Sequence, residues 1–79
     1  MNLNIVSPEN TIFTGEAQSV TIPGSKGEFE VLDNHAPIIS SMKAGTLKFK
    51  TNGEERKIEI KSGFIDVANN EVSICVESR

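Results

Sequence analysis

The stretch that decides the fold is GSKGEFEVLDNHAPIISSMKAG, which occupies residues 24–45 and holds the only histidine of the chain. It begins with a predicted turn, followed by a short strand in which Phe29 and Val31 alternate with two outward glutamates. An acidic loop comes next, and Ala36-Pro37 then favours an extended backbone, because proline disfavours the helical region for the residue before it. The stretch therefore predicts β structure that displays polar groups.

The run 38–42, IISSM, fits two periodicities, since apolar residues three and four apart also suit a helix. β-Branched residues directly after proline favour a strand, and Gly45 starts a new strand after a span too short for a stable helix. We therefore expect residues 38–42 to be extended.

Period-two alternation of apolar and polar residues dominates the rest of the chain and predicts strands with one solvated face. The apolar members are Leu3/Ile5, Val20/Ile22, Phe29/Val31, Leu47/Phe49, Ile58/Ile60, Ile65/Val67 and Val72/Ile74/Val76. The expected turns are Thr14-Gly15, Pro23-Gly24, Asn52-Gly53 and Asn69-Asn70, and the last two suit two-residue hairpins that need positive φ at both positions. The pattern predicts an all-β fold, a small antiparallel β-sandwich or flattened barrel of about eight to ten short strands.

The length of 79 residues predicts a single domain, residues 1–79, with one modest core. A chain of this size buries only about 60–65% of its unfolded surface, so a partner that covers more apolar area would stabilise it. We assign to the core Leu3, Ile5, Phe13, Val20, Ile22, Phe29, Val31, Leu47, Ile58, Ile60, Ile65, Val67, Val72 and Ile74. Phe49 and Phe64 are expected to be partly exposed docking surface.

Charge and composition exclude several classes of protein. The net charge is −3, and the lysines are interleaved with carboxylates, which argues against a nucleic-acid partner. The N-terminus lacks the pattern of a signal peptide, and no stretch approaches the ~18 apolar residues of a membrane-spanning helix. Cys75 is the only cysteine, so it cannot form an internal disulfide, and its strand pattern predicts a structural thiol in a reducing compartment.

The sequence gives little support for a catalytic or metal-binding site. Asp33, His35 and Ser40 or Ser41 could supply an orienting group, a base and a nucleophile, yet loop neighbours cannot converge on one reacting atom without further scaffold. One histidine and one cysteine supply no recognised metal-ligand spacing. Residues 24–27 are glycine-rich but lack the spacing of a phosphate-binding loop. We expect no catalytic residue, no metal and no cofactor.

Residues 24–45 resemble the epsilon subunit of the rotary ATP synthase, whose family pattern runs Gly-x-x-Gly-x-(Phe/Leu)-Gly-(Val/Ile)-x-Pro-Gly-His-Ala-Pro. The residues on this pattern and its continuation are Gly24, Gly27, Phe29, Val31, His35, Ala36, Pro37, Ile38, Ile39, Met42 and Gly45. Glu30 replaces a glycine of the pattern, and Asp33-Asn34 replaces Pro-Gly. Residues 5–9 with 13–15 resemble the family's opening, and residues 62–67 resemble its second signature, so the resemblance spans nearly the whole chain.

The resemblance implies a non-catalytic central-stalk subunit that couples the gamma subunit to the c-ring during ATP synthesis. It also implies a peripheral membrane protein on the cytoplasmic side of the bacterial inner membrane, which meets the membrane only through the ring and is a monomer when isolated. Members of the family carry a C-terminal pair of helices that restrains ATP hydrolysis. Since the 79 residues stop about where the β-domain should stop, we expect a short form without that restraint.

Two sets of contacts follow from the resemblance. The expected gamma-subunit contacts are Ser7, His35, Ser40 and Met42, and the expected contacts with the polar loops of the c-ring are Glu28, Glu30 and Asp33. The residues taken alone allow plainer interpretations. His35 would be a loop imidazole bonded to a backbone group or to Asp33, the carboxylates a solvated strand edge, and Ser7 a turn residue.

Two other classes of protein remain as alternatives. A biotin or lipoate carrier domain would be modified on Lys43, because Met42-Lys43 echoes the carrier motif, although the residues around it lack the pattern of a hairpin tip. A β-sandwich module that binds carbohydrate or peptide would need an aromatic platform, and the chain has no Trp and no Tyr.

Overall fold

The computed structural model describes residues 1–78, and within that range it contains eight strands and no helix. The strands are β1 (Asn2–Val6), β2 (Thr11–Glu16), β3 (Ser19–Gly24), β4 (Gly27–Leu32), β5 (Ile38–Met42), β6 (Gly45–Thr51), β7 (Glu54–Ala68) and β8 (Glu71–Ser78). The all-β prediction is confirmed. The ambiguous run 38–42 is a strand, as its β-branched residues predict.

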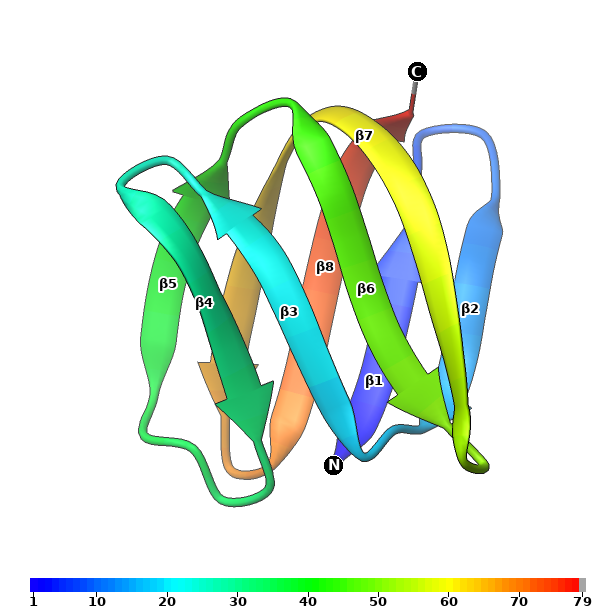
Figure 1. The fold of residues 1–79 in the computed structure, drawn as a ribbon, viewed down its shortest axis with the longest axis vertical. Helices are drawn as coiled ribbons and strands as arrows, with labels where there is room; N and C mark the ends of the chain where they lie inside the picture. The colour runs from blue at the N-terminus through cyan, green and yellow to red at the C-terminus, as the bar shows by residue number, and fades with distance from the viewer. Residues whose placement is uncertain (79) are drawn as a thin grey trace.

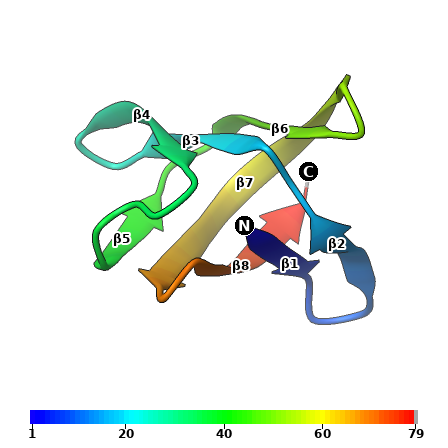
Figure 2. The same ribbon diagram turned by 90° about the horizontal axis from the view of Figure 1, so that it is seen from below.

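The strands form two layers that pack face to face and share strand β7 (Figures 1 and 2). One layer has the order β4-β3-β6-β7, and the other has the order β5-β7-β8-β1-β2. A single residue pair, Gly24 with Met42, joins β3 to β5 and links the two layers at one side. The molecule is therefore a sandwich that is partly closed into a flattened barrel.

Strand β7 joins the layers because it bends in the middle. The pairing register shifts between Ile60 and Ser62, and Lys61 and Ser62 are both exposed, so the alternation changes phase at this point. Such a β-bulge bends a strand and increases its twist. The first half of β7 pairs with β6 and the second half with β5 and β8. The two alternating runs that the sequence contains here, 58–60 and 65–67, thus belong to one strand of 15 residues.

One strand pair departs from the predicted antiparallel arrangement. Strands β1 and β8 are parallel, with Leu3 opposite Val72 and Ile5 opposite Ile74. A parallel pair needs a long connection, and these two strands are joined by all the others. Since no hairpin turn fixes their relative direction, local patterns in the sequence could not reveal it.

Two of the four expected turns are confirmed. Asn52-Gly53 connects β6 to β7 and Asn69-Asn70 connects β7 to β8, with φ of 51° and 77° in the first turn and 53° and 61° in the second. Thr14-Gly15 and Pro23-Gly24 lie inside strands, so their prediction as turns is wrong. The β3–β4 turn is formed by residues 25–26.

Gly24 is required by close packing of the backbone and not by a turn. A Cβ atom on this residue would lie 2.6 Å from the carbonyl oxygen of Gly27, so the hairpin closes only without a side chain here. A glycine that permits a close backbone approach looks the same in sequence as one that permits a turn.

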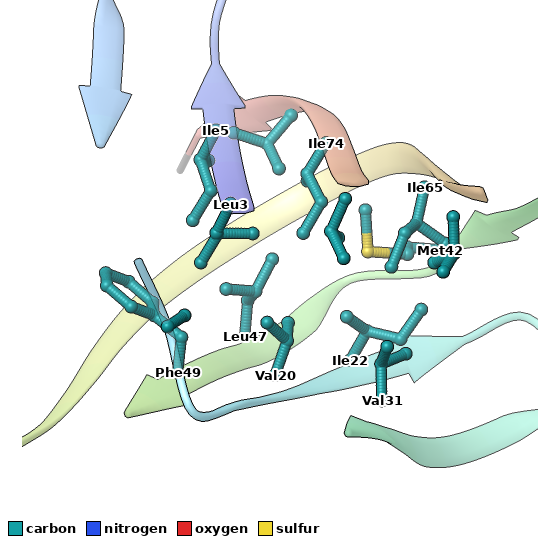
Figure 3. Packing of buried hydrophobic residues seen from close by; sticks show 14 of the residues in the cluster. Leu3, Ile5, Val20, Ile22, Val31, Met42, Leu47, Phe49, Ile65 and Ile74 are labelled. Carbon is teal, nitrogen blue, oxygen red and sulfur yellow. The ribbon is translucent and has the colours of Figure 1, made fainter. Parts of the chain in front are cut away.

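The core fills the space between the two layers, and Figure 3 shows its packing. The buried hydrophobic residues are Met1, Leu3, Ile5, Ala17, Val20, Ile22, Val31, Met42, Leu47, Phe49, Ile60, Ile65, Val67, Val72, Ile74 and Val76. Most of the predicted core is confirmed. Phe13, Phe29 and Ile58 are only partly buried and pack against the rim of the core.

The two phenylalanines expected to share a docking role have opposite environments. Phe49 is 3% exposed, so its prediction as docking surface is wrong, whereas Phe64 is 64% exposed. The ring of Phe49 stacks in a tilted arrangement on Phe13, with ring centroids 4.7 Å apart. The guanidinium of Arg56 lies over the ring of Phe13, 5.8 Å from its centroid.

Candidate functional site

The outer surface of the layer β5-β7-β8-β1 carries the two most exposed large hydrophobic side chains of residues 1–78. Ile39 on β5 is 77% exposed and Phe64 on β7 is 64% exposed. The register places Ser41 opposite Phe64, and Phe64 opposite Cys75. Phe64 and Cys75 also line a groove of about 470 Å³, whose rim includes Ser7. We call this surface, defined by Ser7, Ile39, Ser41, Phe64 and Cys75, the Phe64 face.

Ser7 and His35 are held by bonds within their own loops. The hydroxyl oxygen of Ser7 accepts a hydrogen bond from the backbone N–H of Asn10 at 3.2 Å, and the Ser7 N–H donates to the carbonyl oxygen of Asn10 at 2.8 Å. His35 Nδ1 lies 2.7 Å from the carbonyl oxygen of Ala36. The turn chemistry expected for Ser7 is therefore present, and the imidazole of His35 is bonded to a neighbouring backbone group instead of to Asp33.

The structure places Met42 in the core, which corrects its assignment to a contact surface. Its side chain is only 3% exposed, and Ser40 on the same side of β5 is half-buried. Alternation along the strand turns Ile38, Ser40 and Met42 inward and turns Ile39 and Ser41 outward. Ile39 is thus a surface residue that sequence reasoning missed, and the alternation within 38–42 was the signal that could have revealed it.

Cys75 also differs from its expected role. Val72, Ile74 and Val76 of β8 point into the core, so the cysteine between them points outward and is exposed. It is part of the Phe64 face and does not pack in the core.

The outer surface of the other layer is charged. Glu28 and Glu30 are exposed on β4, and Lys48 of β6 lies directly opposite Lys57 of β7. A groove of about 550 Å³ on this surface is lined by Glu28, Lys43 and Lys57 among others. We call the surface defined by Glu28, Glu30, Lys43, Lys48 and Lys57 the Glu28 face. Glu30, which replaces the glycine of the family pattern, is paired regularly with Thr21 and leaves the strand intact.

Asp33 does not join the two glutamates. Its Oδ1 atom lies 2.5 Å from the amino nitrogen of Met1, which also donates to the carbonyl oxygen of Ala17 at 3.1 Å. The carboxylate of Glu16 is 3.8 Å from the same ammonium group. Asp33 therefore connects the loop after β4 to the start of β1. It is engaged within the chain and is not simply a solvated carboxylate at a strand edge.

The remaining candidates for chemistry are not assembled into a site. Asp33 and His35 bond to different partners, and residues 1–78 contain no group of three or more side chains that could hold a metal ion. Lys43 lies in the link from β5 to β6, and its N–H donates to the carbonyl oxygen of Pro23 at 2.9 Å. This link crosses between layers and is not the hairpin tip that a carrier lysine occupies. Over the same described range, no helix meets the length and hydropathy that crossing a bilayer requires.

Comparison with known sequences identifies close similarity to one group. A family model described as the β-sandwich domain of the ATP synthase delta/epsilon chain matches residues 1–79. The chain is 41% identical over 76 residues to the ATP synthase epsilon chain of Desulfitobacterium hafniense (strain Y51), covering 96% of this chain and 58% of that protein. It is 36% identical over 77 residues to the epsilon chain of Leptospira borgpetersenii, covering 98% of this chain and 61% of that protein.

Solved structures show the same fold. A chain in the Euglena gracilis mitochondrial ATP synthase OSCP/F1/c-ring structure superimposes with a TM-score of 0.87 at 25% identity, over 94% of this chain and 48% of that one. A chain in the Tetrahymena thermophila mitochondrial ATP synthase central stalk/c-ring structure gives 0.85 at 13% identity, over 99% and 63%. The 79 residues thus span about half to three-fifths of the length of the proteins they resemble.

Proposed function

This chain belongs to the family of the ATP synthase delta/epsilon chain β-sandwich domain, and from that membership we propose that it connects the gamma subunit to the c-ring in the central stalk. In this role it transmits force between two partners and makes or breaks no covalent bond. The connection keeps gamma and the ring turning together, so that torque from ion translocation reaches the catalytic head.

The observation that carries the proposal is the contrast between the two outer surfaces of the sandwich. The Phe64 face presents two large, highly exposed hydrophobic side chains, and the Glu28 face presents charged side chains of both signs. The two surfaces lie on opposite layers of the sandwich, and Figure 2 shows how these layers are arranged. A body that must hold two partners at once needs two separate surfaces of different chemistry.

The Phe64 face is the proposed contact with gamma. Exposed apolar side chains supply affinity when a partner covers them, because burial of apolar surface is the main favourable term in protein association. Ile39 and Phe64 supply that surface here, and Ser7 lines the groove beside Phe64. Of the other expected contacts, His35 lies in the loop before β5, and Ser40 is half-buried on the inward side of β5. A contact that transmits torque should be stable, so we expect it to bury about 1,600 Å² in total or more.

The Glu28 face is the proposed contact with the polar loops of the ring. Glu28 and Glu30 are exposed on an edge strand, where basic side chains of a partner can reach them. Exposed pairs of this kind contribute only about 0.2–1 kcal/mol each, so they orient the two bodies more than they hold them together. Asp33 plays a smaller part in this proposal, because its carboxylate is already engaged by Met1.

Force transmission requires a stiff body, and the fold supplies one. Strand β7 pairs in both layers, so the two sheets are joined by continuous backbone as well as by side-chain packing. Interiors packed in this way have low compressibility and transmit strain. The proposed location is the cytoplasmic side of a bacterial inner membrane, which the chain would reach through the ring.

A binding experiment with the gamma subunit tests the proposal. We expect the folded 79-residue chain to retain gamma in a pull-down at micromolar concentration and to lose most of it when Phe64 is replaced by Asp. The matched control is Glu30→Gln, which changes the opposite face and should leave gamma binding unchanged. A well-folded chain that does not bind gamma at micromolar concentration would refute the proposed function.

A further inference from the structure

Strand β5 has a free edge, and the identity of its residues makes that edge unusual. On one side β5 pairs with β7 along its whole length, from Ile38 opposite Val67 to Met42 opposite Gly63. On the other side it meets β3 only at the pair Gly24–Met42. The first part of β5 therefore has no strand beside it on that side within residues 1–78.

Two backbone hydrogen bonds between β5 and β3 define the direction of the backbone groups at this edge. The N–H of Ser25 donates to the carbonyl oxygen of Ser41 at 3.1 Å, and the N–H of Lys43 donates to the carbonyl oxygen of Pro23 at 2.9 Å. Residues 41 and 43 thus point their backbone groups toward β3. Because these groups alternate sides along a strand, the N–H and C=O of Ile39 point to the same side, where β3 no longer accompanies β5.

A groove runs along this free edge, between β4 of one layer and β5 of the other. It has a volume of about 540 Å³, and Phe29, Ile38 and Ile39 form its apolar lining. Phe29 and Ile38 are partly buried at its base, and Ile39 at its rim is 77% exposed. Lys26 and Glu28 also line the groove, which therefore offers apolar side chains flanked by charges directly beside a free backbone donor and acceptor.

The other free edges of the sandwich are protected, and this one is not. Natural sheets guard their edges with charges, bulges or prolines. Strand β4 carries Glu28 and Glu30, and β2 has a register shift where Ile5 and Val6 pair with it. Strand β5 reads IISSM and contains no charged residue, and the large apolar side chain of Ile39 is exposed. An unguarded edge next to an apolar groove is the arrangement that accepts an additional strand.

We propose that an extended segment of the gamma subunit adds a strand to the free edge of β5. In this arrangement the segment exchanges backbone hydrogen bonds with Ile39 and places an apolar side chain in the groove formed by Phe29 and Ile38. The recognised chemistry is an uncharged segment with alternating apolar residues, because every second side chain of an added strand points into the groove. The inference rests on the proposed function and specifies how the contact is made.

Amide hydrogen exchange on the chain with and without gamma tests this contact directly. In the free chain the Ile39 amide should exchange fast, because it has no acceptor, while the Ser40 amide is protected by pairing with β7. In the complex, we expect exchange at Ile39 to slow by at least about tenfold, with little change at Ser40.

Three outcomes would overturn the inference, and they are distinguishable. If the complex forms but Ile39 exchanges as it does in the free chain, gamma docks on the side chains only, so the edge inference is wrong and the proposed function stands. If no complex forms, both the edge inference and the proposed function are wrong. If the Ile39 amide is already protected in the free chain and its protection rises with concentration, the edge pairs with a second copy of this chain.

Two substitutions at one position separate the backbone from the side chain. Ile39→Pro removes the N–H at the free edge without removing a hydrogen bond inside the chain, whereas Ile39→Thr keeps both the N–H and the branched side chain. We expect Ile39→Pro to weaken gamma binding at least about tenfold more than Ile39→Thr does. Glu30→Pro, on the guarded edge of β4, is the matched control and should bind as the unmodified chain does. Equal effects of the two Ile39 variants, in chains that melt normally, would overturn the backbone contact.

Discussion

Phe64 and Phe49 are the same residue type on two neighbouring strands, yet the structure predicts opposite consequences when each is truncated to alanine. Phe64 is 64% exposed, and Phe49 is 3% exposed in the core. Phe64→Ala should therefore impair binding and spare folding. Phe49→Ala should impair folding and affect binding only through the loss of folded protein.

The expected change in Kd for Phe64→Ala follows from the exposed area of the side chain. A phenylalanine side chain presents about 200 Å² when fully exposed, so the 64% still exposed on Phe64 amounts to about 130 Å². If gamma covers all of it, burial at about 25 cal/mol per Å² is worth about 3 kcal/mol, or about a 100-fold change in Kd. Association costs reduce this figure, so we expect a loss of about 10- to 100-fold for Phe64→Ala.

The stability of the same variants completes the comparison. Removing the exposed ring of Phe64 should change the free energy of unfolding by no more than about 0.5 kcal/mol. Removing the buried ring of Phe49 should cost about 3–5 kcal/mol, which is a large part of the roughly 4–12 kcal/mol expected for a chain of this length. Urea unfolding gives the stabilities, and calorimetric titration of gamma into the folded chain gives Kd. The reasoning is refuted if Phe64→Ala binds gamma as tightly as the unmodified chain, or if Phe49→Ala unfolds at the same urea concentration.

Further substitutions test other parts of the structure. Gly63→Ala would bring a Cβ atom to 2.6 Å from the carbonyl oxygen of Cys75, so urea unfolding should show a loss of about 1–3 kcal/mol, and an unchanged midpoint would contradict the packing. Asn69 has φ of 53°, so Asn69→Ala should cost about 1 kcal/mol while Asn69→Gly costs little, and the reverse order would exclude the assigned turn. Asp33→Asn removes the nearest carboxylate of the Met1 ammonium and should cost about 1 kcal/mol at low ionic strength and less in ~0.5 M salt. The exposed thiol of Cys75 should react with a maleimide in the folded chain and be protected by gamma, and equal labelling rates with and without gamma would place the contact elsewhere.

Local patterns in the sequence were sufficient to predict most of the fold. Alternation identified the strands and most of the core, and Asn-Gly and Asn-Asn identified two hairpins, because both signals depend on residues close together in the chain. The bulge in β7 was missed because a single extra residue at Lys61 shifts the alternation and makes one strand read as two. The parallel pairing of β1 with β8 joins the two ends of the chain, so no local pattern could report it.

For the candidate surfaces too, local patterns predicted some features, and contacts between distant residues could not be predicted. Glu28 and Glu30 were correctly expected on an exposed strand face, since alternation with Val31 dictates it. Met42 was expected at a contact surface because of the family resemblance, whereas alternation along β5 turns it inward and exposes Ile39 instead. The bond between Asp33 and the amino group of Met1 connects residues 32 apart, and it became visible only when the fold brought them together.

The central claim is that one rigid sandwich holds two partners through opposite faces at the same time. The most direct measurement is co-sedimentation of gamma with detergent-solubilised c-rings in the presence and absence of the chain. Gamma should sediment with the rings to a greater extent when the chain is present. Phe64→Ala should reduce the amount of gamma that sediments with the rings and leave the chain on them. Glu28→Gln combined with Glu30→Gln should weaken binding to the rings by about 2- to 30-fold and leave the chain on gamma. If gamma instead displaces the chain from the rings, the two partners compete for one surface and the account is contradicted.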